Sequence, residues 1–195
     1  MAPAAGILLT GGRSRRLGVD KATLVVEGET LAVRAGHRLA AVCSPVVEIG
    51  DGRSGLPSVR ERPPGSGPLA ALAAAGTALR DRGHDGPALV LAVDLPAVDE
   101  PLLRWLRDRA GEPTAVPRVD GRLQLVCARY AGEALAAAAS LVAGGVRALH
   151  ELLDVVEYEV IDESEWRAIA GGDAFADVDT ADDAERLGIR LPGLA

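Results

Sequence analysis

Residues 4–21 read AAGILLTGGRSRRLGVDK. The segment opens with an apolar run, Ala4–Leu9, which predicts a buried strand. After Leu9 the run breaks into two glycines, three arginines, a third glycine and a lysine. Glycines let backbone N–H groups turn toward an anion, and the cations supply opposite charge. A loop of this kind directly after a buried strand predicts a phosphate-binding site.

Strand-like and helical runs alternate along the chain beyond this loop. The predicted strands are Ala4–Leu9, Val46–Ile49, Ala88–Val93, Ala115–Val116, Leu123–Ala128 and Val155–Ile161. The predicted helices are Leu31–Val42, Leu69–Leu79, Leu102–Arg109, Glu133–Val142 and Val146–Leu153. Such alternation favours an α/β fold whose sheet is largely parallel and covered by helices on both faces.

Local turn and cap signals refine this pattern. Asp120-Gly121 predicts a tight turn between antiparallel strands. Asp99 predicts a helix start, and Thr180 followed by Asp183 resembles a capping box. The Gly/Pro-rich loops Gly50–Gly55 and Arg62–Gly67 are expected beside the first glycine loop, if the strands before them are parallel to the first.

Composition narrows the class of protein. At 195 residues and 48% hydrophobic content, the chain is expected to be one folded domain, residues 1–195. No apolar run is long enough to cross a bilayer and the start lacks a signal peptide's features, so a cytoplasmic protein without membrane contact is expected. A net charge of −7 disfavours nucleic acid as a partner. Cys43 and Cys127, far apart among apolar residues, are expected to be buried reduced thiols.

The glycine loop does not match the two commonest phosphate-binding motifs. Lys21 is neither preceded by glycine nor followed by Ser or Thr, which excludes a Walker A loop. The spacing of Gly11, Gly12 and Gly18 does not fit the dinucleotide-binding fingerprint. Spacing alone leaves a solvated basic loop as an alternative.

Two acidic segments are candidates for a metal site. Asp94 ends the apolar run of residues 89–93, and a carboxylate at the carboxyl end of a strand can hold Mg²⁺ against phosphates. Asp177 and Asp179 alternate along an extended segment, so they should project to one face. From each segment alone, a turn cap or an acidic helix entry remains an alternative. The segment Gly65–Leu72 reads as a loop for close approach of a flat ring, or as a simple helix entry.

Taken together, these motifs resemble the molybdenum cofactor guanylyltransferases of the nucleotidyltransferase superfamily. That family reads Leu-Ala-Gly-Gly-x-Ser-x-Arg-Met-Gly-x-Asp-Lys, which Leu9–Lys21 matches with Thr10 for Ala and Leu17 for Met. The family's Gly-Pro-Leu-Ala-Gly, Asp-x-Pro and Asn-x-Asn-Thr segments resemble Gly67–Ala71, Asp94–Pro96 and Asp177–Thr180. The resemblance implies a Rossmann-like three-layer, GT-A-like fold with a nucleotide-binding half, about 1–112, and an acceptor-binding half, about 113–195.

The resemblance also implies roles for individual residues. The implied catalytic residues are Arg16, Lys21 and Asp94. The implied nucleotide-binding residues are Leu9, Thr10, Gly11, Gly12, Lys21, Gly67, Pro68, Leu69 and Asp94. The implied metal ligands for Mg²⁺ are Asp94 and Asp179. The implied acceptor-binding residues are Gln124, Arg147, Asp177 and Asp179. The histidines, which are not expected to act as bases, are His37, His84 and His150.

The implied reaction is transfer of GMP from GTP to molybdopterin, with release of pyrophosphate and transient contact with molybdoenzymes or cofactor-insertion proteins. Pro64 stands where family members often carry an Asp that contacts guanine. The alternatives are therefore cytidylyl transfer to molybdopterin or nucleotidyl transfer to another small phosphorylated acceptor. A non-catalytic nucleotide-binding module and a structural partner of a molybdoenzyme are alternatives from other classes.

Overall fold

The computed structural model describes residues 4–11, 17–109, 111 and 113–191. In this part of the chain, one mixed sheet has the strand order β10-β7-β9-β6-β1-β4-β5, and β8 pairs with β7. The strands of this sheet are β1 (Ala5–Leu9), β4 (Val46–Ile49), β5 (Ser58–Val59), β6 (Ala88–Ala92), β7 (Thr114–Val119), β8 (Arg122–Leu123), β9 (Cys127–Tyr130) and β10 (Tyr158–Ile161). Neighbouring strands are parallel except where β8 or β9 pairs.

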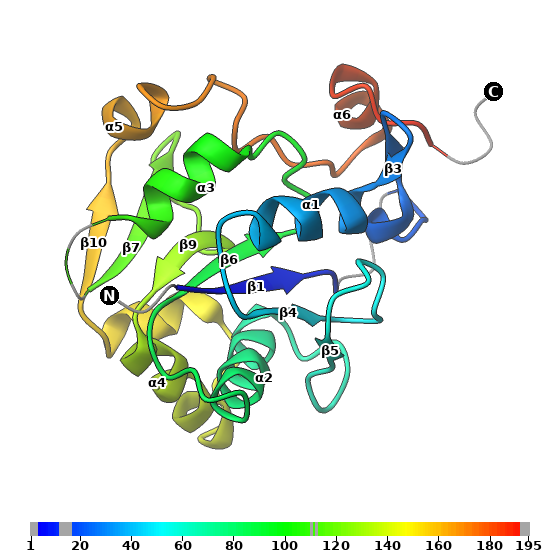
Figure 1. Cartoon of the computed structure of the whole chain (residues 1–195). Coiled ribbons are helices and arrows are strands. Elements are labelled where there is room, and N and C mark those ends of the chain that lie inside the picture. The colour runs from blue at the N-terminus through cyan, green and yellow to red at the C-terminus, as the bar shows by residue number, and fades with distance from the viewer. Residues whose placement is uncertain (1–3, 12–16, 110, 112, 192–195) are drawn as a thin grey trace.

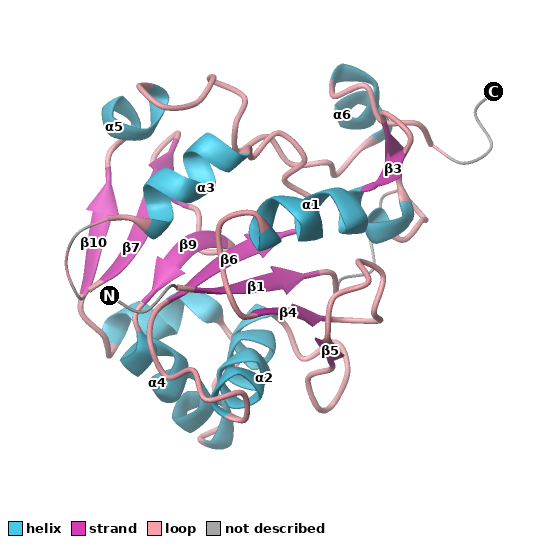
Figure 2. Cartoon of the chain, in the orientation of Figure 1, coloured by secondary structure: helices cyan, strands magenta, loops and turns pink. Residues whose placement is uncertain are grey.

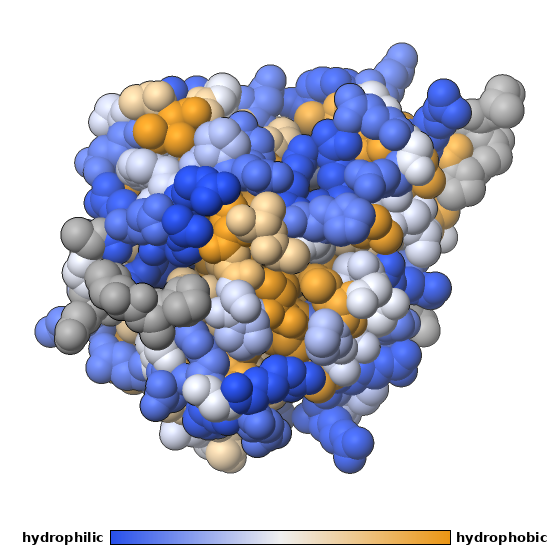
Figure 3. Space-filling model, viewed as in Figure 1, coloured by the Kyte–Doolittle hydropathy of each residue, from blue (hydrophilic) through white to orange (hydrophobic). Residues whose placement is uncertain are grey.

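Helices cover both faces of the sheet, so the predicted three-layer α/β architecture is confirmed (Figure 1). The helices and helical turns are η1 (Lys21–Thr23), α1 (Leu31–Ala40), α2 (Pro68–Arg80), α3 (Glu100–Arg107), α4 (Gly132–Ala143), η2 (Leu149–Asp154), α5 (Glu163–Arg167) and α6 (Ala181–Arg186). Figure 2 shows α1 and α3 on one side of the strands and α2 and α4 on the other. The face seen in Figure 3 is mostly hydrophilic, with apolar residues gathered near the middle of the view.

The first strand shows how sequence sets these layers. Side chains of a strand alternate between faces, and all five residues of β1 are buried. Ala5, Ile7 and Leu9 pack in the core formed with α2 and α4. Leu8 packs in the second core, with α1 and α3. A strand buried on both faces needs a continuous apolar run, as residues 4–9 provide.

The loops after the central parallel strands share one edge of the sheet. β1 is parallel to both β4 and β6, and β4 is parallel to β5. The segments after these strands begin at Thr10, Gly50, Arg60 and Val93. The glycine loop, the two Gly/Pro-rich loops and Asp94 therefore follow the carboxyl ends of neighbouring strands, as predicted.

Four predicted elements are wrong in extent. The predicted strand Ala115–Val116 is part of a longer strand, β7, which runs over Thr114–Val119. The predicted strand Leu123–Ala128 is two strands, because a turn at Leu125 and Val126 separates β8 from β9. The predicted helix Val146–Leu153 is a 3₁₀ helix that starts only at Leu149, after an extended Ala148. The last strand, β10, starts at Tyr158 instead of Val155.

Other local predictions are confirmed. Asp120 and Gly121 both have positive φ, 47° and 76°, in the turn that joins antiparallel β7 and β8. Asp99 caps α3 by accepting from Leu102 N. Thr180 and Asp183 form the capping box of α6.

A small hairpin next to the glycine loop was not predicted. It pairs β2 (Val25–Val26) with β3 (Glu29–Thr30). Its turn residues Glu27 and Gly28 have φ of 51° and 88°, the left-handed conformation that two-residue hairpin turns require. β5 and α5 were also not predicted.

Both cysteines are free and buried, as predicted. Burial raises the pKa of the Cys43 and Cys127 thiols to about 12 in each case. Within the described ranges, no helix combines the length and the apolar character that crossing a membrane requires.

Candidate active site

Lys21 lies between two aspartates from distant parts of the chain. Its Nζ is 3.0 Å from Asp94 Oδ2 and 2.6 Å from Asp179 Oδ1. The Lys21 side chain is 11% exposed, whereas those of Asp94 and Asp179 are 29% and 40% exposed. The ammonium is therefore enclosed, while both carboxylates remain reachable from solvent. The structure brings three of the predicted site residues into one cluster.

Local structure on three segments produces this meeting. Asp20 caps η1 by accepting from Ala22 N, and this fixes the turn that carries Lys21. Asp94 follows β6, where Val93 N donates to Leu9 O and extends the β1–β6 pairing by one bond. The sheet edge thus places Asp94 beside the first loop.

The third segment, residues 177–179, is tied directly to the second. Val178 N donates to Asp94 O at 3.0 Å. The Val178 side chain is fully buried with Val93 in the core cluster around η1. Because side chains of an extended segment alternate, burial of Val178 turns Asp177 and Asp179 away from this core, as predicted.

The charges in the cluster shift each other's titration. Burial of the Lys21 ammonium alone would lower its pKa, but hydrogen bonding and attraction from Asp179 and Asp94 outweigh burial and raise that pKa above its usual value. Lys21 is therefore a permanent cation. Partial burial of the Asp177 carboxyl raises its pKa, and the negative charges of Asp179 and Asp94 raise it further.

The cluster has the donor chemistry that a divalent cation needs. A cation, the Lys21 ammonium, already bridges the carboxylates of Asp94 and Asp179. Among the described residues, no group of three His, Cys, Asp or Glu side chains could hold a metal ion. Mg²⁺ is typically bound by one or two carboxylates together with substrate phosphates, so two aspartates at an open edge fit this ion.

The predicted nucleotide-binding residues that the structure describes, apart from Lys21 and Asp94, fall into two groups, one at the end of β1 and one at the start of α2. Leu9 and Thr10 are buried at the end of β1, and Gly11 is exposed. Gly67, with φ of 92°, is the N-cap of α2, and Pro68 is its first residue. Leu69 is fully buried in the core, backbone included, so the structure offers no exposed surface of this residue to a ligand. The predicted residues Gly12 and Arg16 lie outside the described residues.

The predicted acceptor-binding residues are spread more widely. The carbonyl oxygen of Arg147 lies 3.9 Å from the position of a Cβ added at Gly67, so the segment after α4 approaches the N-terminus of α2. Arg147 is exposed, and its guanidinium bonds only its neighbour's carbonyl among the described contacts. Gln124 follows β8 and donates its N–H to Pro117 O at 2.8 Å.

Sequence reasoning missed two buried glutamates, one in β4 and one in the loop after β5. Glu48 lies within β4 and is completely buried, and four groups donate hydrogen bonds to its carboxylate. Glu61 is 9% exposed and accepts from Gly65 N at 2.8 Å, across the loop before α2. The sequence signal that could have identified them is an acidic residue within, or directly after, a run that otherwise predicts a strand.

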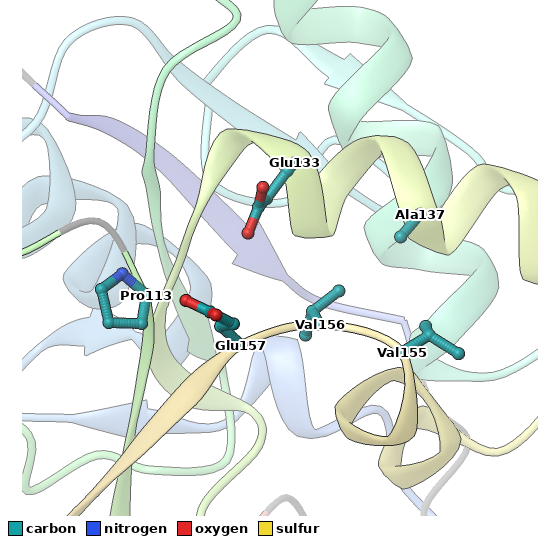
Figure 4. A pocket seen from close by; sticks show the side chains of 6 residues that line it. All are labelled: Pro113, Glu133, Ala137, Val155, Val156 and Glu157. Atoms are coloured by element: carbon teal, nitrogen blue, oxygen red, sulfur yellow. The ribbon is translucent and has the colours of Figure 1, made fainter.

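A cavity in the described part of the chain lies away from this cluster (Figure 4). It measures about 490 Å³ and is lined by Pro113, Glu133, Ala137, Val155, Val156 and Glu157. Pro113 and Glu157 immediately precede the parallel strands β7 and β10, so the cavity is at the amino ends of those strands. The Lys21 cluster is at the opposite, carboxyl edge.

Comparison with known proteins assigns the chain to a family. Residues 6–158 match the MobA-like NTP transferase domain. This chain belongs to that family. It is 36% identical over 163 residues to a probable molybdenum cofactor guanylyltransferase of Mycobacterium tuberculosis, covering 78% of this chain and 80% of the relative. It is 34% identical over 185 residues to the protein of the same name from Mycobacterium avium, covering 89% and 92%.

Solved structures of this MobA-like NTP transferase's relatives support the fold. Molybdopterin-guanine dinucleotide biosynthesis protein A from Archaeoglobus fulgidus superimposes with a TM-score of 0.78 at 22% identity, covering 94% of this chain and 96% of that one. A nucleotidyl transferase from Methanothermobacter has a TM-score of 0.72 at 18% identity, covering 96% and 97%. The mixed, mainly parallel sheet is thus that of nucleotidyltransferases, and the predicted fold class and family are confirmed.

Proposed function

We propose that this nucleotidyltransferase transfers GMP from GTP to the terminal phosphate of molybdopterin and releases pyrophosphate. The observation that carries the proposal is the position of Lys21 between Asp94 and Asp179, in a chain of the MobA-like family. Relatives named molybdenum cofactor guanylyltransferase align over most of this chain. Residues 1–112 would bind the nucleotide and residues 113–195 the acceptor, in one domain.

Nucleotidyl transfer from this site requires alignment and charge neutralisation. A phosphate oxygen of the acceptor attacks the α-phosphorus of GTP, and the bond from that phosphorus to the oxygen leading to the β-phosphate breaks. A phosphate monoester dianion is itself a nucleophile, so no histidine or covalent intermediate is needed. The protein must hold two anions in line and offset their repulsion.

Lys21 is the described residue best suited to offset that repulsion. An ammonium has three N–H donors, and the two aspartates accept from two of them. The third can donate to a phosphate oxygen. Because the chain as a whole carries a charge of −7, attraction of a polyanion depends on cations concentrated near the glycine loop, among which we include Arg16.

Asp94 and Asp179 would hold Mg²⁺ together with the nucleotide's phosphates. A bound Mg²⁺ would act as a Lewis acid on those phosphate oxygens. Asp177, two residues before Asp179 and turned to the same side of the extended segment, would help to orient the acceptor. Backbone groups of Leu9 to Gly12 and of Gly67 and Pro68 would line the nucleotide, and Gln124 and Arg147 would contact the pterin.

A second candidate differs in the base. Pro64, exposed in the loop before α2, stands where the family often has a guanine-contacting Asp. Cytidylyl transfer, or transfer to another phosphorylated acceptor, would use the same residues around the phosphates. Only the choice of nucleotide and acceptor would change.

A pyrophosphate-release assay with GTP, CTP, UTP and ATP, each with and without molybdopterin, tests the proposal. We expect release with GTP that depends on molybdopterin and on Mg²⁺, and loss of release in Asp94→Ala with an unchanged far-UV circular dichroism spectrum. Preference for CTP would favour the second candidate. Near-normal turnover of Asp94→Ala would contradict the metal assignment, and no release with any nucleotide in the presence of molybdopterin would contradict nucleotidyl transfer to molybdopterin.

A further inference from the structure

Glu48 is a carboxylate sealed inside the sheet edge that carries the glycine loop. It lies in β4, beside β1, and none of its surface is exposed. Its Oε1 accepts from Thr10 Oγ1 at 2.6 Å and from Arg53 N at 2.9 Å. Its Oε2 accepts from Ser54 Oγ at 2.5 Å and from Ser54 N at 2.9 Å. Each oxygen therefore receives one hydroxyl and one backbone N–H.

Four donors around the two oxygens favour the ionised form of this side chain. Burial alone would raise the pKa of Glu48, but the hydrogen bonds from Ser54, Thr10 and Arg53 lower it below its usual value. A glutamine could not replace it without loss. Whichever end its amide nitrogen occupied, that nitrogen would face a backbone N–H that cannot turn away.

The Thr10 hydroxyl is the only group in this network that belongs to the nucleotide-binding segment. Thr10 N also donates to Ile49 O at 3.1 Å, so both its backbone and its side chain are bound to β4. A Cβ added at Gly50, where φ is 155°, would lie 2.0 Å from Thr10 Oγ1. The hydroxyl thus fills a slot that only glycine at position 50 leaves open.

The same loop also reaches the far end of the glycine loop. Arg53, whose N–H is bound to Glu48, places its Nε 3.5 Å from Asp20 Oδ2. Asp20 caps the turn that carries Lys21. The loop of residues 50–55 therefore lies against both ends of the glycine loop, at Thr10 and at Asp20.

We propose that Glu48 is a positioning residue for nucleotide binding. It acts through Thr10, whose bond to Glu48 holds the backbone of Thr10 and Gly11 where it can bind the nucleotide's phosphates. The inference rests on the proposed function, since it assumes that the segment after β1 binds a nucleoside triphosphate. Thr10 stands where the family motif quoted above has Ala, and an Ala at that position could not make this bond.

Thr10→Val tests the connection with the smallest change. Valine keeps the shape of threonine and removes only the hydroxyl that binds Glu48. Backbone groups that bind phosphates in both ground and transition state affect mainly KM. We expect Thr10→Val to raise KM for GTP, and the dissociation constant of a fluorescent GTP analogue, by about tenfold, the effect of one lost hydrogen bond to a charge. We expect kcat to stay within about twofold.

Two further variants separate positioning from general stability. Thr10→Ser keeps the hydroxyl and is expected to recover most of the lost affinity. Thr77→Val makes the same chemical change on the exposed side of α2, where the hydroxyl bonds only Ala73 O and Arg80, and is expected to bind GTP as the wild type does. Thermal melting of every variant shows that binding is measured on folded protein.

The outcomes distinguish this inference from the proposed function. If the wild type binds GTP and releases pyrophosphate while folded Thr10→Val matches it in both KM and dissociation constant, the positioning role is wrong. Equal losses in Thr10→Val and Thr10→Ser would contradict a role for the hydroxyl. If the wild type itself neither binds GTP nor releases pyrophosphate, it is the proposed function that fails.

Discussion

Two carboxylate sites lie on the same edge of the sheet and differ in what holds them. Asp94 and Asp179 are partly exposed and share one side-chain cation, Lys21. Glu48 is fully buried and held by two backbone N–H groups and two hydroxyls. An ion pair near solvent can exchange partners at little cost. A buried carboxylate fixed by backbone groups cannot. The exposure of the first site is what our proposal of ligand entry requires, whereas the second site ties adjoining segments of the chain together.

Removing the shared cation should have the largest effect. Lys21→Met keeps the stem of the side chain and deletes the charge, so the two aspartates and the incoming phosphates repel one another. We expect turnover to fall by about 10³-fold or more, as for loss of a group that stabilises transition-state charge. Steady-state pyrophosphate release measures it. Arg80→Met, an exposed cation at the end of α2, is the control; comparable rates in both variants would contradict the role of Lys21.

Replacing the buried carboxylate of Glu48 should mainly lower the free energy of unfolding. Glu48→Gln is expected to lower the free energy of unfolding by about 2–4 kcal/mol, since two donors lose their partner inside the protein. Urea denaturation at pH 7 measures it, with exposed Glu133→Gln as the control.

The same variant has a defined pH dependence. The pKa of Glu48 is lowered from 4.5 on folding, so its contribution to stability is complete above about pH 4.5 and is lost as the pH falls through the lower folded value. The difference in stability between wild type and Glu48→Gln should therefore shrink in acid. A difference that is constant from pH 7 to pH 3 would mean that Glu48 is not ionised in the folded protein.

A neutral residue at position 179 should change metal dependence and leave the fold unaltered. Asp179→Asn is expected to raise the Mg²⁺ concentration for half-maximal rate by about tenfold or more, because a ligand charge is lost. Titration of the rate with Mg²⁺ measures it, and exposed Asp173→Asn is the matched control. Unchanged Mg²⁺ dependence would reduce Asp179 to a partner of Lys21.

The smallest effect is expected at Asp177. Its pKa is raised by partial burial and by the charges of Asp179 and Asp94, so the ionised form costs stability at neutral pH. Asp177→Asn should stabilise the ligand-free protein at pH 7 by no more than about 0.5 kcal/mol, as for other surface changes. The gain should disappear as the pH falls below about 3.8, the ordinary value of this group. Destabilisation at pH 7 would show that the charge has a favourable partner.

Sequence predicted what depends on periodicity and local chemistry. The apolar run of residues 4–9, the cap at Asp99 and the turn at Asp120-Gly121 each determine their own conformation. The alternation of Asp177 and Asp179 around Val178 similarly predicted that both carboxylates would face away from the core. Asp94 was predicted because a single carboxylate ended an apolar run.

The structural features that sequence did not reveal depend on long-range contacts. Nothing in the run Val46–Ile49 shows that Glu48 faces Thr10, 38 residues earlier, because the contact depends on which strands are neighbours. The short hairpin at Glu27-Gly28 was missed because each strand has only two residues. The predicted strand Leu123–Ala128 failed because apolar content does not reveal a turn within the run.

Lys21 is the only lysine in the sequence, and every other basic side chain apart from the histidines is an arginine. One compact ammonium therefore sits where two carboxylates converge, and a planar guanidinium would not match those contacts. A reagent specific for ε-amines thus has a single target in this protein, at the candidate catalytic centre. Such a reagent reacts with the neutral amine, so the rate at which mass is added to the intact chain would report how readily Lys21 leaves its two aspartates and loses its proton.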